Sequence, residues 1–174
     1  MSLSCSAWSS PLRDTRHDLD IRQAAVRWWP GLPWRLWKAQ LIAESGLDPT
    51  ARSPVGAEGI AQFMGPTWAE VSKDLGYVDV PRSSARHAIN AGAYYMAKIK
   101  RPWRMPEFER HKFTAAAYNA GGGNIRRAWR LCGEPQDWST ASKCLEDITG
   151  RHHTETLNYV ARIFRLWQEL EKRG

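Results

Sequence analysis

The sequence predicts a mainly α-helical protein, and three observations lead to this fold class. Apolar residues recur at intervals of three and four along several segments, which is the spacing of one helix face. Proline or glycine marks the breaks between these segments. The chain has 174 residues, of which 43% are hydrophobic and 25% charged, a size and composition that suit one domain with an ordinary core.

The N-terminal part is expected to contain two helices. Residues 1–17 are polar and irregular, which predicts a flexible lead-in or a strap across the surface of a single domain at 18–174. A first helix is expected at 18–29, where a Pro-Gly pair ends it. A second is expected at 33–45, with proline in its first turn and Gly46 just past its end.

A glycine-rich segment follows the second helix. Residues 46–65 leave room only for extended pieces or a short hairpin, because glycine weakens helices and favours turns. Thr67 and Glu70 have the spacing of a capping box, in which each side chain bonds the backbone N–H of the other. This pair predicts a helix over 67–75 that stops at Gly76.

Four further helices are expected in the C-terminal half, at 84–99, 107–118, 124–131 and 154–171. Pro102 separates the first two, and the alanine-rich end of the second permits close packing against a neighbour. The apolar residues of the last helix follow helical spacing and are expected to face inward: Leu157, Val160, Phe164, Trp167 and Leu170. No repeat or low-complexity tract interrupts this pattern.

Glu44 is the first candidate for chemistry. Trp37, Leu41 and Glu44 stand at i, i+4 and i+7, so the carboxylate lies on the apolar face of its helix. Desolvation there raises the pKa of a carboxyl group and keeps it partly protonated near neutral pH, as a general acid requires. The alternative is a helix-end glutamate that reaches sideways to solvent or to an arginine.

Three sequence blocks connect Glu44 with a known family. The first comprises Glu44-Ser45, Pro49, Ala51, Ser53, Gly56-Ala57, Gly59, Gln62, Met64 and Thr67. The second is Ala115-Ala116-Ala117-Tyr118-Asn119-Ala120-Gly121, and the third is Glu155-Thr156-Leu157-Asn158-Tyr159-Val160. In this order they resemble the motifs of the lytic transglycosylases that carry the SLT (soluble lytic transglycosylase) domain. One glycine-rich block would be a weak signal, whereas three in order form a specific one.

The resemblance implies a lysozyme-like fold of the SLT or goose-type-like kind and a peptidoglycan lytic transglycosylase that needs one acid. Glu44 would protonate the oxygen of the β-1,4 bond between N-acetylmuramic acid and N-acetylglucosamine, while the substrate's 2-acetamido oxygen assists at C1. The Glu44 carboxylate would then deprotonate the muramyl O6, which closes a 1,6-anhydro ring. One group can act as acid and then as base.

Four substrate-binding residues follow from the first block. By motif position, Ser53 and Gln62 are expected to orient the acetamido group and the acid. For Ser53 a loop-stabilising hydrogen bond is an equally open role, because serine is common in turns. Phe63 and Met64 are expected to form an apolar wall against the sugars.

The second and third blocks supply three more binding residues. The resemblance places the Tyr118 hydroxyl near Glu44, lets Asn119 bond the substrate, and lets Tyr159 line the cleft. Glu155 is interpreted as structural, since an acid in the first turn of a helix interacts favourably with the helix dipole.

The ten tryptophans are interpreted mainly as core residues, because most of them lie at helical spacing. Trp68 and Trp103 are the better candidates for a sugar-binding groove, where aromatic rings stack on sugar faces.

The formal net charge of +7 and the pI of about 9.6 call for an anionic partner. The basic residues are scattered, and no helix-turn-helix, zinc-finger or RNA-recognition pattern accompanies them, so nucleic acid is not expected. Peptidoglycan strands and anionic outer-membrane or wall polymers suit the charge better, and a monomer is expected.

The N-terminal sequence Met1-Ser2-Leu3-Ser4-Cys5 lacks the basic and apolar regions of a signal peptide. A compact, basic chain of this family resembles a phage endolysin. Such an enzyme would wait in the host cytoplasm for holin-dependent release and then lyse the host from the periplasm.

The three cysteines leave the redox state open. Cys132 and Cys144 could close a short loop by a disulfide, or remain free thiols in a reducing compartment. With His152 and His153 they make a loose set whose spacing matches no zinc pattern, so no metal or cofactor is expected.

Two other functions remain possible. A goose-type-like muramidase, a hydrolase of the same bond, would need a second carboxylate to hold a water molecule. Asp48 and Glu58 are the nearest acids in the sequence, and they are interpreted as a turn residue and a solvated residue. A non-enzymatic wall-binding or virion protein would keep the fold as a scaffold and would not depend on Glu44.

Overall fold

The computed structural model describes residues 10–173, which fold into helices joined by turns. The α-helices are α1 (Asp18–Trp28), α2 (Trp34–Ser45), α3 (Gly65–Leu75), α4 (Ala85–Lys100), α5 (Glu107–Ala120), α6 (Gly122–Leu131), α7 (Trp138–Ala141), α8 (Glu146–Thr149) and α9 (His153–Glu171). Short 3-10 turns are η1 (Pro11–Arg13), η2 (Ser142–Cys144) and η3 (Gly150–His152). No strand forms within these described residues, so the mainly α fold class is confirmed.

Helix α3 begins two residues earlier than the capping-box pattern predicts. Its N-cap is Met64, whose side chain makes no capping bond, and Pro66 stands in the first turn. Proline is well suited there because its φ is already helical and the missing N–H would have no partner in the helix. Thr67 therefore lies inside the helix, and the predicted capping box does not form.

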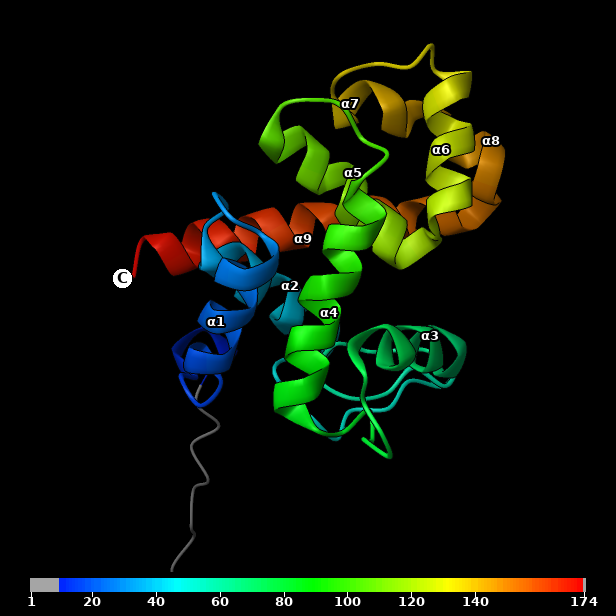
Figure 1. The fold of residues 1–174 in the computed structure, drawn as a ribbon. Coiled ribbons are helices and arrows are strands. Elements are labelled where there is room, and N and C mark those ends of the chain that lie inside the picture. The colour runs from blue at the N-terminus through cyan, green and yellow to red at the C-terminus, as the bar shows by residue number, and fades with distance from the viewer. Residues whose placement is uncertain (1–9, 174) are drawn as a thin grey trace, which may run out of the picture.

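The helices α2, α5 and α9 form the part of the fold that positions the candidate site. In Figure 1 the long α9 crosses the molecule, with α2 packed against it and α5 running up to it. Helix α4 connects the two sides, since it packs against α1, α3 and α5. The short helices α7 and α8 gather beside α6 at one end of the molecule (Figure 1).

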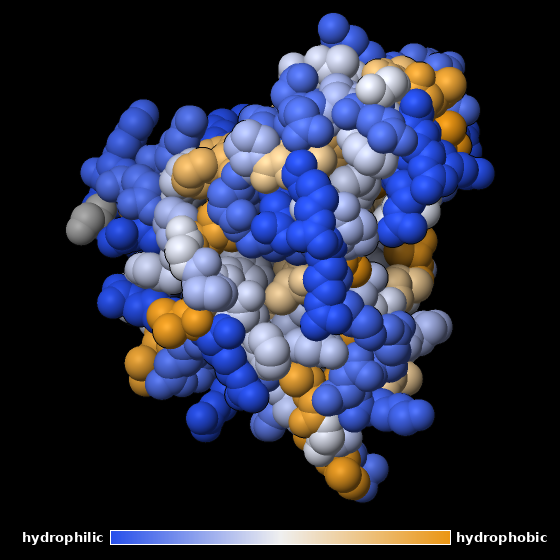
Figure 2. Space-filling view, turned by 45° about the horizontal axis from the view of Figure 1, so that its top comes forward, coloured by the Kyte–Doolittle hydropathy of each residue, from blue (hydrophilic) through white to orange (hydrophobic). Residues whose placement is uncertain are grey.

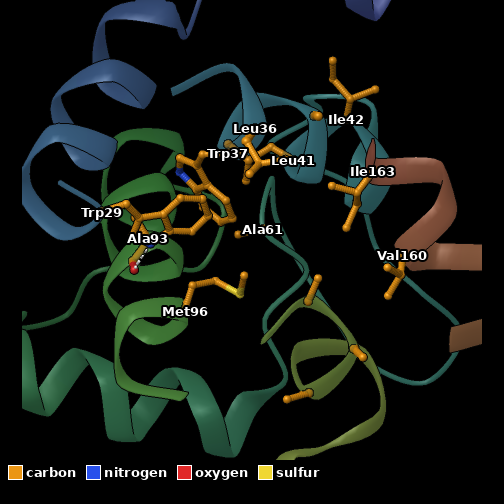
Figure 3. Packing of buried hydrophobic residues seen from close by; sticks show 14 of the residues in the cluster. Trp29, Leu36, Trp37, Leu41, Ile42, Ala61, Ala93, Met96, Val160 and Ile163 are labelled. Atoms are coloured by element: carbon orange, nitrogen blue, oxygen red, sulfur yellow. Dashed lines mark hydrogen bonds between the residues drawn. The ribbon is translucent and has the colours of Figure 1, made fainter. Parts of the chain in front are cut away.

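The core is built around tryptophan and aliphatic side chains from α1, α2 and α4. Figure 3 shows the Trp29 and Trp37 rings side by side, with their centroids 5.3 Å apart. The indole N–H of Trp29 donates to the carbonyl oxygen of Ala93 at 2.9 Å, so this buried polar group is satisfied (Figure 3). From the other side, Val160 and Ile163 of α9 complete the packing (Figure 3).

Gly92 allows α4 to approach α2 closely. A Cβ atom at this position would lie 2.7 Å from the ring of Trp37 and 3.3 Å from the Cβ of Ala61. Such a contact is too short for two carbon atoms, so a larger residue would force the helices apart. The close packing fixes the helix that carries Glu44.

The prediction that Trp68 and Trp103 line a groove is wrong. Both are buried, with 9% and 2% of their surface exposed. The indole N–H of Trp68 donates to the carbonyl oxygen of Val80 at 3.1 Å, and the Trp103 ring lies 5.0 Å from that of Phe113. These rings stabilise the core and have no open face for a sugar.

The glycine-rich segment at 46–64 is made of turns. It contains two isolated antiparallel bridges, Arg52 with Glu58 and Glu58 with Phe63, and no strand among the described residues, so the hairpin that was one of the two expected forms does not form. Gly59 has a φ of 83°, and a Cβ there would lie 2.2 Å from the carbonyl oxygen of Arg82. Only glycine fits this close approach of two backbones.

The predicted lead-in at 1–17 is described in part, because residues 1–9 lie outside the described residues. Residues 10–17 contain η1 and then a turn in which Arg16 bonds the carboxylate of Asp14 at 2.6 Å. The Asp14 carbonyl oxygen accepts a 2.6 Å hydrogen bond from Nζ of Lys38, so this stretch is tied to α2.

Cys132 and Cys144 form a disulfide bond, which answers the question that the sequence left open. The bond joins the end of α6 to η2, within the group of short helices at one end of the fold. It closes a loop with a sequence separation of 12 and restricts the unfolded chain accordingly.

The surface in Figure 2 is mostly hydrophilic, with hydrophobic residues in small separated groups. Isolated apolar groups of this kind are normal on a folded domain. None of the described helices has the length and hydropathy that crossing a bilayer would require.

Candidate active site

Glu44 lies in the last turn of α2, where its side chain is half-buried. Gly46 ends the helix in the left-handed conformation, and the Ser45 hydroxyl donates to the carbonyl oxygen of Ile60 at 2.8 Å. Burial raises the pKa of Glu44 from 4.5 to about 7, although the hydrogen bond from Tyr159 and the charge of Arg162 act in the opposite direction. Both protonation states are therefore populated near neutral pH, as the sequence predicted from the helix face.

Tyr159 holds the Glu44 carboxylate from the opposite helix. Its hydroxyl group donates a hydrogen bond to Oε1 of Glu44, although the two residues are 115 positions apart in the sequence. Desolvation and the nearby Glu44 raise the pKa of Tyr159 well above its usual value, so the phenol stays protonated and remains a donor. The packing of α9 on α2 thus fixes the orientation of the acid.

A cavity of about 380 Å³ opens beside this pair. It is lined by Ala43, Glu44, Asn119, Glu155, Asn158, Tyr159 and Arg162. The volume lies within the range typical of ligand-binding pockets. Three residues predicted from the sequence, Glu44, Asn119 and Tyr159, are brought together here from three different helices.

Asn119 is oriented by the first turns of α9. Its amide Nδ2 donates to Oε1 of Glu155 at 3.3 Å, and its Oδ1 accepts from the hydroxyl of Thr156 at 2.8 Å. Glu155, interpreted from the sequence as a structural residue, therefore also lines the Glu44 cavity. The cavity contains two carboxyl groups, of which Glu44 is half-buried and Glu155 is exposed.

A second, smaller cavity of about 60 Å³ collects Gln62, Phe63, Met64, Thr67, Tyr95 and Tyr118. Phe63 is only 2% exposed and belongs to the core, so little of it is available as an open wall, whereas Met64 is 42% exposed. The Tyr118 hydroxyl donates to the carbonyl oxygen of Ala61 at 2.7 Å. It also lies near enough to Glu44, as the motif position implied, for that carboxylate to help burial raise the pKa of Tyr118 well above its usual value.

Ser53 and Gln62 support their own loop. The backbone N–H of Ala57 donates to the Ser53 hydroxyl oxygen at 3.0 Å, which is the loop-stabilising role left open by the sequence. Gln62 has a φ of 48°, and its amide Nε2 donates to the carbonyl oxygens of Gly59 at 2.9 Å and Ala51 at 3.2 Å. Ser53 lines neither of the two cavities described above.

Sequence reasoning missed Asn158 and Arg162, although a signal for them was present. Glu155, Tyr159 and Arg162 stand at i, i+4 and i+7 on α9, so they share one helix face. This face lines the open Glu44 cavity, although Glu155 and Arg162 also remain exposed to solvent. A charged residue at this spacing from a motif tyrosine is therefore a candidate for the site.

The amino-acid sequence matches the model of a known protein family. The model described as "Transglycosylase SLT domain" matches residues 22–140, more than half of the chain. The membrane-bound lytic murein transglycosylase F of Actinobacillus pleuropneumoniae serotype 3 (strain JL03) is 34% identical over 147 residues, which cover 80% of this chain and 29% of the relative. The protein of the same name from Thiobacillus denitrificans is 31% identical over 135 residues, covering 74% and 27%.

Two solved structures share the fold. The 70 kDa soluble lytic transglycosylase SLT70 from Escherichia coli has a TM-score of 0.68 at 22% identity, over 87% of this chain and 24% of that one. An inactive mutant of the lytic transglycosylase Slt from Pseudomonas aeruginosa gives the same TM-score and identity, over 90% and 24%. The chain thus spans less than a third of the length of these relatives and structures. By the family model that covers most of its helices, this chain belongs to the transglycosylase SLT domain family.

Proposed function

We propose that this chain is a peptidoglycan lytic transglycosylase in which Glu44 is the catalytic acid and base. The observation that carries the proposal is a single carboxyl group with a pKa of about 7, held by Tyr159 at the edge of a cavity. The names of its relatives, lytic murein transglycosylases, support the same reaction class. The substrate is the β-1,4 bond between N-acetylmuramic acid and N-acetylglucosamine.

The reaction proceeds in two proton transfers. Protonated Glu44 gives its proton to the glycosidic oxygen as the bond to C1 breaks, and the acetamido oxygen of the substrate stabilises the electron-poor C1. The Glu44 carboxylate then takes the proton of the muramyl O6 hydroxyl, and O6 forms the new bond to C1. No water is consumed. A pKa near 7 suits a group that must serve as acid and base in one cycle.

The neighbours of Glu44 orient its side chain and stabilise its ionised form. The Tyr159 hydroxyl orients the carboxylate, and the cation of Arg162 stabilises the negative charge that Glu44 carries between the two transfers. Asn119 and Asn158 present amide groups to the cavity, where they would bind hydroxyl and acetamido groups of the glycan.

The residues around the smaller cavity are proposed as the other wall of the glycan-binding site. Met64 offers an exposed apolar surface, while Gln62, Phe63 and Tyr118 give that wall its shape. Ser53 is proposed to act more remotely, by holding the loop through Ala57.

A muramidase is the second candidate, because Glu155 places another carboxylate in the Glu44 cavity. Two carboxylates on either side of a glycosidic bond can hydrolyse it when one of them activates water. Glu155 is exposed and accepts a hydrogen bond from Asn119, so its carboxylate can contact solvent.

Product analysis separates the candidates. Purified peptidoglycan is digested with the wild type, Glu44→Gln and Glu155→Gln, and the fragments are identified by mass spectrometry. A lytic transglycosylase gives 1,6-anhydro ends, needs Glu44 and keeps substantial activity without Glu155. A hydrolase gives reducing ends and needs both acids. Absence of any Glu44-dependent product would favour the non-enzymatic wall-binding or virion protein.

The biological setting is a separate part of the proposal: a monomeric phage endolysin that lyses the host from the periplasm. The net charge of +7 suits an anionic envelope, and the Cys132–Cys144 disulfide suits an oxidising compartment. Expression in a Gram-negative host should cause lysis only when the inner membrane is also permeabilised, and Glu44→Gln should abolish it. Lysis by Glu44→Gln would contradict this role.

A further inference from the structure

A cationic cavity lies at the other end of α2 from Glu44. It has a volume of about 500 Å³, is open to solvent, and is bordered by η1, the start of α1, the first turns of α2 and the end of α9. Trp34 in its wall and Glu44 are ten residues apart on α2, which separates them by about 15 Å along the helix axis. The two cavities share no lining residue. We call this one the arginine cavity.

Five cations and one carboxylate line the arginine cavity: Arg13, Arg22, Arg35, Lys38 and Arg173, with Asp18. Lys38 is almost fully buried and already neutralised, because its Nζ lies 2.6 Å from Asp18 Oδ1 and 2.6 Å from the Asp14 carbonyl oxygen. The charge of Asp18 is thus paired with that of Lys38 and does little to balance the charges of the arginines.

The arginines carry most of the uncompensated charge. Arg35 has a distant partner, Glu171, at 3.5 Å. Arg13, Arg22 and Arg173 form no ion pair with any residue of the described chain, 10–173. Like charges around one hollow repel each other, and an anion in the hollow would relieve that repulsion.

Trp34 orients part of this cationic surface. The guanidinium of Arg22 lies 4.2 Å from the centroid of the Trp34 ring, and that of Arg35 lies 5.1 Å from it. Cation–π contacts of this kind hold a guanidinium plane while leaving its N–H groups free to donate. The ring and two leucines that also line the cavity provide apolar surface beside the charges.

We infer that the arginine cavity binds a phosphate ester group. Guanidinium groups form paired hydrogen bonds with phosphate oxygens, and a tetrahedral phosphate can satisfy several arginines that approach from different sides. The apolar surface then contacts the carbon part of the ester. This inference goes beyond the proposed activity and does not depend on the chemistry at Glu44.

The test compares two double variants that lose the same charge. Arg22→Gln with Arg173→Gln removes two exposed cations that line the cavity, whereas Arg126→Gln with Arg130→Gln removes two equally exposed cations from α6, away from the cavity. Binding of glycerol phosphate is measured by calorimetry at low salt, and binding of vesicles with and without phosphatidylglycerol by sedimentation. Circular dichroism and the thermal midpoint check that each variant is folded.

The wild type and the α6 variant should bind a phosphate ester alike, and the cavity variant about tenfold or more weakly, as for lost charge-assisted hydrogen bonds. If the cavity variant binds glycerol phosphate more weakly than the α6 variant does, the site accepts soluble esters. If the two variants differ only in binding to vesicles that contain phosphatidylglycerol, the ligand is a lipid headgroup at the same site. Equal weakening in both double variants, or no binding by the wild type to either probe, overturns the inference. Turnover of soluble glycan fragments, read in parallel, reports separately on Glu44.

Discussion

The polar residues around the Glu44 cavity and those of the loop at 46–64 are used in different ways. On the helices, Glu44, Asn119 and Tyr159 line a shared cavity. Their hydrogen bonds join residues far apart in the sequence: Tyr159 bonds Glu44, and Asn119 bonds Glu155. In the loop, Ser53 and Gln62 bond backbone groups within the same loop. In a loop without regular structure, side chains such as these satisfy backbone groups that no helix or strand pairs, so these side chains are less available to a ligand.

The largest expected effect comes from the helix side of this comparison. Glu44→Gln keeps the shape of the side chain but cannot give or take a proton, so turnover should fall roughly 10²- to 10⁴-fold, as for loss of a general acid–base group. Release of glycan fragments measures this loss. Glu146→Gln, an exposed acid on α8, is the matched control and should act like the wild type. A fully active Glu44→Gln enzyme would refute the proposed mechanism.

The raised pKa of Glu44 also predicts how stability depends on pH. The folded chain keeps this proton up to about pH 7, whereas in the unfolded chain the group loses it near 4.5. The folded state therefore binds more protons between these values, and the free energy of unfolding falls as pH rises through the window. The total loss is about 3 kcal/mol, given a pKa of about 7 in the folded chain and 4.5 in the unfolded chain.

Glu44→Gln should remove this pH dependence. Urea unfolding at pH 5 and pH 8 should show a wild type that is less stable at pH 8, and a variant that has gained about 3 kcal/mol over it there. If the free energy of unfolding changed equally with pH in both proteins, the Glu44 carboxylate would be well solvated in the folded chain.

Two tyrosines sharpen the comparison further, since one bonds the acid and the other the loop. Tyr159→Phe removes a hydrogen bond that lowers the pKa of Glu44, so the alkaline limb of the activity profile should move to higher pH and turnover should fall about tenfold. Tyr118→Phe removes the bond to Ala61 and should cost about 1 kcal/mol of stability while the limb stays in place. Identical profiles for both variants would mean that Tyr159 does not act on Glu44.

The smallest effect is expected in the loop itself. Ser53→Ala loses the hydrogen bond from the Ala57 N–H, which should lower the free energy of unfolding by about 1 kcal/mol and leave turnover within about twofold. Thermal unfolding and initial rates on glycan fragments measure both. A tenfold loss of turnover at unchanged stability would instead assign Ser53 to the substrate.

Helical periodicity over long segments was sufficient to predict the fold class and the position of Glu44 on an apolar helix face. The catalytic role of Glu44 came from the motif blocks and stays a prediction. The sequence could not predict α7 and α8, since four-residue helices contain too little of the helical period to be recognised. Trp68 and Trp103 were misplaced because a single aromatic residue outside a clear stripe gives no information about which side it faces. Burial of these rings is decided by tertiary packing.

The site was predictable residue by residue only where a motif pointed to it. Glu155 and Arg162 were underestimated because charged side chains on a helix usually face water. Their entry into the site depends on α9 packing across the end of α2, which is a long-range feature of the fold. The disulfide, likewise, required the distance between the end of α6 and η2.

Gly92 limits how this protein can be engineered. The absence of a side chain at that position lets the Trp37 ring sit against α4, two turns before Glu44 on the same helix face. A side chain there would push the Trp37 ring and displace α2, and with it Glu44, although Gly92 itself lines neither of the two cavities near Glu44. Libraries designed to retune cleavage should leave this position unchanged and vary the rim of the cavity instead.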